Sequence, residues 1–173
     1  TTTTNTDNKP ALRWGRYTDL EERPERFFLA HRLLARHAVA HGPGFWIRFT
    51  VHYNLCFGTV LAVGGPEQRE ELAPGGALER SGAVGCFALT EKFAGVQSGL
   101  VVQTVARFDG GAFELHTPRP AAAKNWISQG FVATRGVVVA DLVVGGRSHG
   151  PHAFVMRLRD DATGALLPGI EVE

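Results

Sequence analysis

Cysteine is nearly absent from the chain, and its scarcity excludes several kinds of protein. Cys56 and Cys86 are the only two cysteines in 173 residues. They are too few for a disulfide framework and do not have the spacing of metal ligands, so we expect a protein of a reducing, intracellular compartment. The sequence leaves peroxisome, mitochondrion and cytoplasm open.

A cluster of metal ligands is also missing. His37 and His41 stand four residues apart and could share one face of a helix. They lack the Glu of a zinc-protease motif, and no third ligand accompanies them. HGPH at 149–152 falls between two predicted strands, where we expect a loop. We therefore predict no metal site.

Neither an excess of one charge nor a long apolar run is present. The 18 Lys and Arg nearly balance 17 Asp and Glu, which leaves a net charge of +1 and no general attraction to nucleic acid. No apolar run reaches the roughly 18 to 20 residues of a membrane-spanning helix. The start, TTTTNTDNKP, lacks the features of a secretory signal. We expect a soluble protein without nucleic acid or a membrane span among its partners.

The first half of the sequence has a helical pattern after a polar segment, 1–18, that we expect to fray. Apolar residues recur at helical spacing over 19–40, and because Pro24 suits a first turn, the main helix is predicted to begin near Glu22 or Arg23. GPG at 42–44 breaks it. After a second apolar stretch, Pro66 can open a short polar helix.

Beyond Gly82 the segments become short, β-branched and aromatic, and Gly, Asp and Pro separate them, as is typical of strands. The clearest hairpin pairs 101–108 with 112–117 around Asp109, Gly110 and Gly111. We predict an α+β protein with a helical portion at 19–81 and a β domain at 82–173.

Two stretches stand out once common nucleotide, hydrolase and redox motifs are found to be missing. They are CFALTEKFAGVQSG at 86–99 and PAAAKNWISQG at 120–130. The first resembles the T-E-x-x-x-G segment, and the second the K-x-W-I-T/S segment, of the acyl-CoA dehydrogenase and oxidase superfamily. The spacing between Thr90 and Trp126, and the later HAFVMRLR and LPGIEVE, also resemble that family.

The resemblance implies a fold and a cofactor. It implies part of an N-terminal helical region followed by an antiparallel, barrel- or sandwich-like middle domain, without the C-terminal helical domain of the family. The middle domain would contact FAD and acyl-CoA. The flavin-binding residues that the resemblance implies are Phe87, Leu89, Thr90, Gly95, Val96, Trp126, Ile127 and Ser128.

A flavin suits such residues, because its ring is a flat, weakly polar plate with hydrogen-bonding edges. By resemblance, Trp126 supplies a face, Ser128 meets the N5 region and Thr90 borders the pyrimidine end. Lys92 and Val96 stand where the dehydrogenase pattern frequently has other residues, so the match is weaker for the substrate side. Glu91 belongs to the strand end and is interpreted as structural.

The resemblance implies part of a flavoenzyme that oxidises acyl-CoA to trans-2-enoyl-CoA in fatty-acid β-oxidation. An α-proton would leave to a base and a β-hydride would pass to FAD. We expect the base outside this chain, which alone would be inactive, and a homo-oligomer, dimer or tetramer, for the full-length protein. The alternative is a noncatalytic binding or structural module of the same fold. Oxidase and dehydrogenase, and the acyl chain length, remain open.

Overall fold

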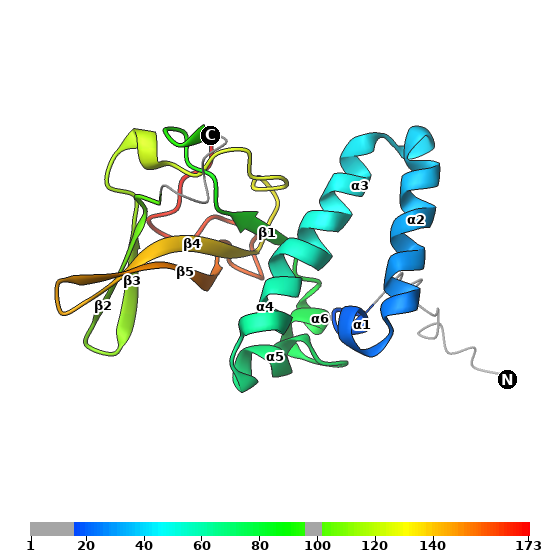
Figure 1. The fold of residues 1–173 in the computed structure, drawn as a ribbon, viewed down its shortest axis with the longest axis horizontal. Helices are drawn as coiled ribbons and strands as arrows, with labels where there is room; N and C mark the ends of the chain where they lie inside the picture. The colour runs from blue at the N-terminus through cyan, green and yellow to red at the C-terminus, as the bar shows by residue number, and fades with distance from the viewer. Residues whose placement is uncertain (1–15, 96–101) are drawn as a thin grey trace, which may run out of the picture.

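Helices make up the first half of the chain and strands the second (Figure 1). The computed structural model describes residues 16–95 and 102–173. The helices are α1 (Asp19–Glu22), α2 (Pro24–His41), α3 (Pro43–Thr50), the π-helix η1 (Val51–Phe57), α4 (Gly58–Val63), α5 (Pro66–Leu72) and α6 (Ala77–Ser81). The strands are β1 (Gly85–Ala88), β2 (Val105–Asp109), β3 (Ala112–His116), β4 (Arg135–Val144) and β5 (Arg147–Arg157), with a 3-10 turn, η3, at Pro120–Ala122. The predicted α+β class is confirmed.

Proline and glycine set the helix ends, as the sequence predicts. Pro24 is the first residue of α2, where its missing N–H costs no helical bond. Gly42 has a φ of 82° and separates α2 from α3. Pro66 opens α5, and the side chain of Gln68 accepts the N–H of Gly65 at 2.9 Å. The change from helix to strand falls just after Ser81, although the division into two domains stays a prediction.

Strand β4 organises the sheet. Its first half pairs in parallel with β1, from Gly85 opposite Arg135, and its second half pairs in parallel with β2. Its other edge carries β5 in antiparallel pairing, and β3 extends the sheet beyond β2. The resemblance implies an antiparallel, barrel- or sandwich-like domain, whereas the sheet is mixed, with two parallel pairings, and its described strands do not close into a barrel. Alternating apolar residues reveal a strand but not the direction of its neighbour.

The two hairpins differ in how well the sequence predicts them. The β2–β3 hairpin is confirmed, with Gly110 and Gly111 at positive φ in its turn. The predicted loop at 149–152 is wrong, because these residues lie inside β5. Pro151 is tolerated there since β5 pairs, within the described part of the chain, only with β4. A register shift between Asp141 and Val143 accommodates this stretch.

The core lies where the helices meet the sheet. Eight buried residues form it: Cys56, Phe57, Val60, Leu61, Leu72, Leu78, Ala83 and Val137. Phe87 of β1 packs against this cluster from the sheet side. Close packing at the junction leaves no room for a side chain at Gly85, the first residue of β1.

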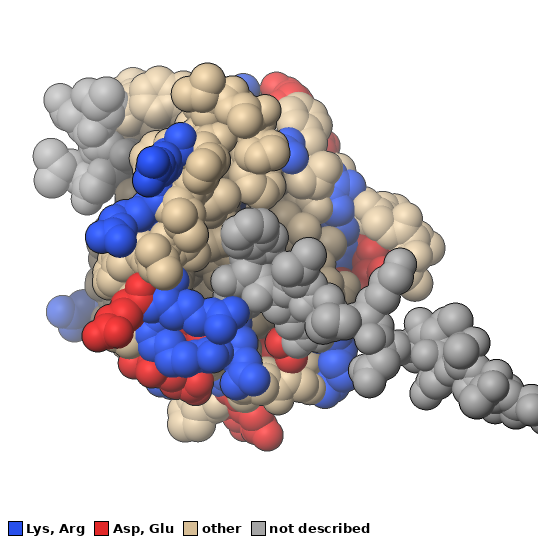
Figure 2. Space-filling view, turned by 90° about the vertical axis from the view of Figure 1, so that its right-hand side faces the viewer, with Lys and Arg blue, Asp and Glu red and all other residues tan. Residues whose placement is uncertain are grey.

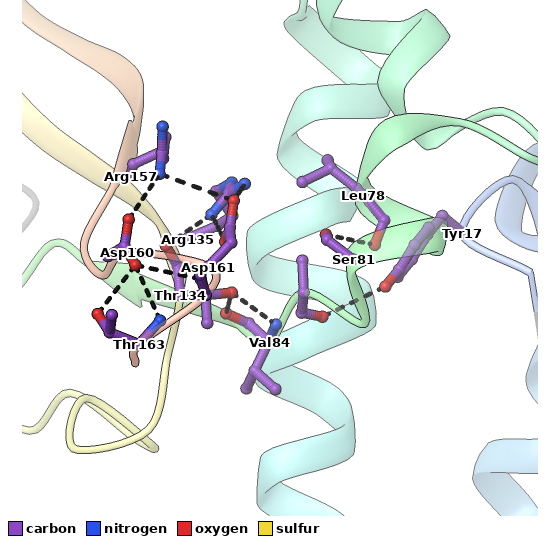
Figure 3. A network of polar contacts seen from close by, with 12 residues as sticks. Tyr17, Leu78, Ser81, Val84, Thr134, Arg135, Arg157, Asp160, Asp161 and Thr163 are labelled. Carbon is purple, nitrogen blue, oxygen red and sulfur yellow. Dashed lines mark hydrogen bonds and ion pairs between the residues drawn. The ribbon is translucent and has the colours of Figure 1, made fainter. Parts of the chain in front are cut away.

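Polar contacts reinforce the same junction (Figure 3). The N–H of Val84 donates to the hydroxyl of Thr134 at 3.0 Å. The guanidinium of Arg135 donates two bonds of 2.8 Å to Asp161, which ties the start of β4 to the segment after β5. This fork raises the pKa of Arg135 and lowers that of Asp161.

Charges of both signs are mixed on the helical face of the molecule (Figure 2). Arg23 pairs with the buried Asp19 at 2.6 Å, and Arg69 donates two bonds to Glu21. Such a mixed surface agrees with the near-zero net charge. Among the described helices, none combines the length and the apolar character needed to cross a bilayer.

His52 of the π-helix connects the helices to the sheet through a neutral ring. Its Nδ1 accepts the N–H of Gly85 at 3.0 Å, and its ring lies 5.5 Å from that of Tyr17 and 4.9 Å from that of Phe57. Burial lowers the pKa of His52 to about 4. The folded protein therefore holds the ring unprotonated at pH values where an exposed histidine is charged.

This histidine predicts a loss of stability in mild acid. The unfolded chain binds a proton at His52 with a pKa of about 6.5, whereas the folded chain binds it only near pH 4. Stability is thus full above pH 6.5 and falls as the pH drops toward 4, by about 2 kcal/mol at pH 5. Urea unfolding at pH 8 and pH 5 measures the difference. His52→Asn keeps an acceptor but does not titrate, so an equal loss in that variant would contradict the assignment.

Candidate functional site

The two segments that stand out in the sequence lie side by side. The N–H of Asn125 donates to the carbonyl of Thr90 at 2.8 Å. The N–H of Lys92 donates to Ala123 at 3.0 Å, and Glu91 forms a β-bridge with Lys124. The end of the first segment and the start of the second therefore form one unit of backbone hydrogen bonds, at the carboxyl end of β1.

Glu91 lies at the centre of this unit and is fully buried, with 0% of its surface exposed. Its carboxylate accepts the N–H of Gln103 at 2.9 Å, and both the N–H and the hydroxyl of Thr104, at 2.8 and 2.9 Å. The ammonium of Lys124 completes the set at 3.0 Å. A carboxylate held by so many donors cannot turn toward a substrate, so these contacts favour a structural role for Glu91.

Lys124 binds both segments and the sheet. Besides Glu91, its ammonium donates to the carbonyl of Leu89 at 3.1 Å and to that of Val139 in β4 at 2.7 Å. Burial lowers the pKa of Lys124, although Glu91 opposes this shift. Burial would raise the pKa of Glu91, but the N–H groups of Thr104 and Gln103 and the ammonium outweigh it and lower the pKa. The lowered pKa keeps Glu91 ionised near neutral pH, with the Lys124 side chain at 3.0 Å as its ion-pair partner.

Trp126 follows this network and has an unusual backbone. Its φ is 59°, and Gln129 has the same value; within the described ranges these are the two non-glycine residues with positive φ. The left-handed region is costly for a bulky residue and is found mostly where the surrounding structure enforces it. The indole is nevertheless 71% exposed. The chain thus holds a large aromatic side chain open to solvent on a strained backbone.

A cleft of about 750 Å³ opens beside this tryptophan. Trp126 and Ile127 line it, together with the side of β1 that carries Cys86 and Ala88. Phe87 points the other way, because successive side chains of a strand alternate, and packs against the helical core. Burial raises the pKa of the Cys86 thiol to about 11, so it is protonated near neutral pH and is no nucleophile.

The structure brings only part of the predicted flavin set to this cleft. Trp126 and Ile127 line it, whereas Phe87, Leu89, Thr90, Gly95 and Ser128 do not. All five are in the described part of the chain, and Val96 lies outside it. No group of three metal-ligating side chains occurs within residues 16–95 and 102–173.

Comparison with known proteins identifies the family. No family model matches the chain. Acyl-coenzyme A oxidase 3 of Yarrowia lipolytica is 36% identical over 126 residues, which are 72% of this chain and 18% of the relative. The crystal structure of acyl-CoA oxidase 3 from that yeast matches 88% of this chain and 22% of its own, with a TM-score of 0.74 and 30% identity. The chain belongs to the acyl-CoA dehydrogenase and oxidase superfamily.

Further superfamily members show the same partial match. Human peroxisomal acyl-coenzyme A oxidase 3 is 36% identical over 69% of this chain and 17% of the relative. Acyl-CoA oxidase-2 of Caenorhabditis elegans, in a crystal structure with FAD, ascaroside-CoA and ATP, matches 72% of this chain and 19% of its own, with a TM-score of 0.61 and 32% identity. The chain spans about a fifth of the length of these acyl-CoA oxidases.

Sequence reasoning missed the residues that hold this superfamily segment in place. Gln103 and Thr104 follow Glu91 by 12 and 13 residues in the sequence, and nothing in their local sequence predicts a buried carboxylate. Lys124 was visible as the lysine of the K-x-W-I segment, but its three acceptors were not. The amide of Gln129 donates to the carbonyl of Gly85, a contact between residues 44 apart that no spacing predicts.

Proposed function

We propose that this chain forms the flavin-contacting part of an FAD-dependent acyl-CoA oxidase that converts acyl-CoA to trans-2-enoyl-CoA in fatty-acid β-oxidation. The observation that carries the proposal is the exposed indole of Trp126, held on a strained backbone beside the Thr90 strand end. The relatives, all named acyl-CoA oxidases, support the oxidase rather than the dehydrogenase form of the reaction.

Trp126 and the other predicted flavin-binding residues are of types that suit a flavin. A flat, weakly polar ring needs one aromatic face and a few donors at its edge. Trp126 offers the face, and the cleft beside it has room for a flat ligand. We assign the ring edge to Thr90, Gly95, Val96 and Ser128, and the supporting wall to Phe87, Leu89 and Ile127.

When bound, FAD would supply the acceptor for the β-hydride of the acyl-CoA and the redox chemistry that reduces oxygen to hydrogen peroxide. The chain's own residues bind and orient the ring. The base for the α-proton is assigned to no described residue, since Glu91 is locked in its network. We also propose that the chain consists of a helical domain at 19–81 and a β domain at 82–173, and that the full-length protein is a dimer or tetramer. Its proposed location is intracellular, because one relative is named as a human peroxisomal enzyme.

Anaerobic titration of the complete gene product with an acyl-CoA tests this function. We expect a yellow protein whose flavin absorbance is bleached by acyl-CoA and returns with oxygen, with hydrogen peroxide formed. A colourless protein, or a flavin that acyl-CoA leaves oxidised, would contradict the proposal.

A tryptophan pair locates the flavin on this chain. Trp126→Ala is expected to raise the Kd for FAD about tenfold or more, because stacking on an aromatic ring is lost. Trp46→Ala is the matched control, since Trp46 lies in α3, among the helices, and should leave the Kd unchanged. Fluorescence quenching of added FAD measures both. Equal effects of the two substitutions would contradict the assignment of Trp126.

A further inference from the structure

The four residues Trp126 to Gln129 form a loop that is bonded at one end to the residues directly after β1 and at the other end to the start of β1. At the near end, the N–H of Asn125 donates to Thr90, and Lys124 donates to the carbonyl of Leu89. At the far end, the side-chain amide of Gln129 donates to the carbonyl of Gly85, where β1 begins. The loop therefore runs alongside the strand, from its carboxyl end back to its amino end.

Gln129 also determines how the loop turns. Its own carbonyl accepts the N–H groups of Val132 at 3.0 Å and Ala133 at 2.9 Å. Its φ of 59° reverses the chain, as does the equal φ of Trp126 at the other end of the loop. Two strained residues in four require contacts that enforce them, and the Gln129–Gly85 bond is the side-chain contact that does so at this end.

The exposure of Trp126 indicates why the backbone of this loop is strained. An indole that is 71% exposed gains little from burial, so hydrophobic packing does not explain the strain of its backbone. A role in ligand binding does explain the strain, because an aromatic side chain whose orientation is fixed in advance loses less conformational freedom when a ligand stacks on it.

From these contacts we infer that Gln129 is a positioning residue, which orients the indole of Trp126 toward a flat heteroaromatic ligand through its bond to the carbonyl of Gly85. This inference rests on the proposed function for the identity of the ligand, the isoalloxazine ring of FAD. It adds a residue outside the predicted flavin-binding set, which acts through Trp126.

Two substitutions remove the bond in different ways. Gln129→Gly removes the side chain and also the strain of positive φ, so the variant is expected to fold. Gln129→Asn keeps an amide and tolerates the left-handed region, but is one methylene too short to reach Gly85. Gln68→Asn shortens a glutamine by the same amount on helix α5, where its side chain accepts the N–H of Gly65 at the helix start, and is the matched control.

The flavin readout compares these variants in the complete gene product. Both Gln129 variants are expected to raise the Kd for FAD about tenfold, and to lower kcat more than they change the KM for acyl-CoA, because a misplaced ring disturbs hydride transfer more than substrate binding. Gln68→Asn should match the wild type. A wild-type Kd and kcat in both Gln129 variants would overturn the inference.

A second readout separates this inference from the proposed function. Before flavin is added, the difference in near-ultraviolet circular dichroism between wild type and Trp126→Phe reports the ordered indole. In the Gln129→Gly background, the same Trp126→Phe difference should nearly vanish. If the wild type binds no FAD, the proposed function fails while this measurement still decides the role of Gln129. An undiminished difference would overturn that role.

Discussion

Lys124→Met is expected to lower the free energy of unfolding by about 3–5 kcal/mol, because it leaves the buried carboxylate of Glu91 without its countercharge. The substitution also removes the donor to the carbonyls of Leu89 and Val139, which hold the strand end to the sheet. Urea unfolding followed by far-ultraviolet circular dichroism measures the loss.

Two further variants show whether the charge is responsible. Glu91→Gln combined with Lys124→Met removes both charges, and should be clearly more stable than Lys124→Met alone. Lys92→Met makes the same chemical change one residue from Glu91, but the Lys92 side chain is 48% exposed and its ammonium pairs with Glu173 at 3.4 Å. It should change stability by less than about 0.5 kcal/mol. Equal losses for Lys92→Met and Lys124→Met would contradict this account.

Gly85→Ala should destabilise the protein by about 3 kcal/mol, because the added methyl group has no space. Its carbon would lie 2.6 Å from the Cys56 sulfur, 2.9 Å from the Cys56 Cβ and 3.1 Å from the Phe57 ring. The chain cannot relax easily there, since the Gly85 N–H is bonded to His52 and its carbonyl to Gln129. The midpoint of thermal or urea unfolding measures the effect.

Gly44→Ala is the control for this substitution. Gly44 lies in the first turn of α3 with no atom within 4 Å of an added methyl group, so alanine should be neutral or slightly stabilising there. Adding Cys56→Ala to Gly85→Ala removes the sulfur and should recover part of the loss. Wild-type stability of Gly85→Ala would show that the junction is looser than its contacts indicate.

Local chemistry explains which elements could be predicted from the sequence. Pro24, Pro66 and the pair Gly110–Gly111 restrict the backbone by themselves, so helix starts and a hairpin follow from their positions. Strand direction depends on distant partners, and the parallel pairing of β1 with β4 was therefore not predicted. The loop predicted at 149–152, between two predicted strands, is wrong because these residues lie inside β5, whose edge position accepts Pro151.

The residues of the candidate site likewise fall into those that the sequence predicts and those that only the structure reveals. Thr90 and Trp126 could be found because their segments resemble a family pattern, and the structure does place the two segments in contact. The supporting residues could not be found, because their roles arise from tertiary contacts. Glu91 is held by Thr104 from another part of the chain, and Gln129 reaches back to Gly85. Their roles in binding FAD stay predictions.

Strand β4 pairs with three strands, β1, β2 and β5, and the different sequence separations of these pairs favour an order of folding. Its pairing with β5 needs only the tight turn at Gly145 and Gly146, so that hairpin can form early. Its junction with β1 joins Val84 to Thr134, 50 residues later, and closing so long a loop is slow. During synthesis the helices emerge well before the strand that completes their core. Until β4 arrives, the backbone N–H and C=O groups along the β4-facing edge of β1 have no partner, and an unpaired edge of this kind is prone to aggregation.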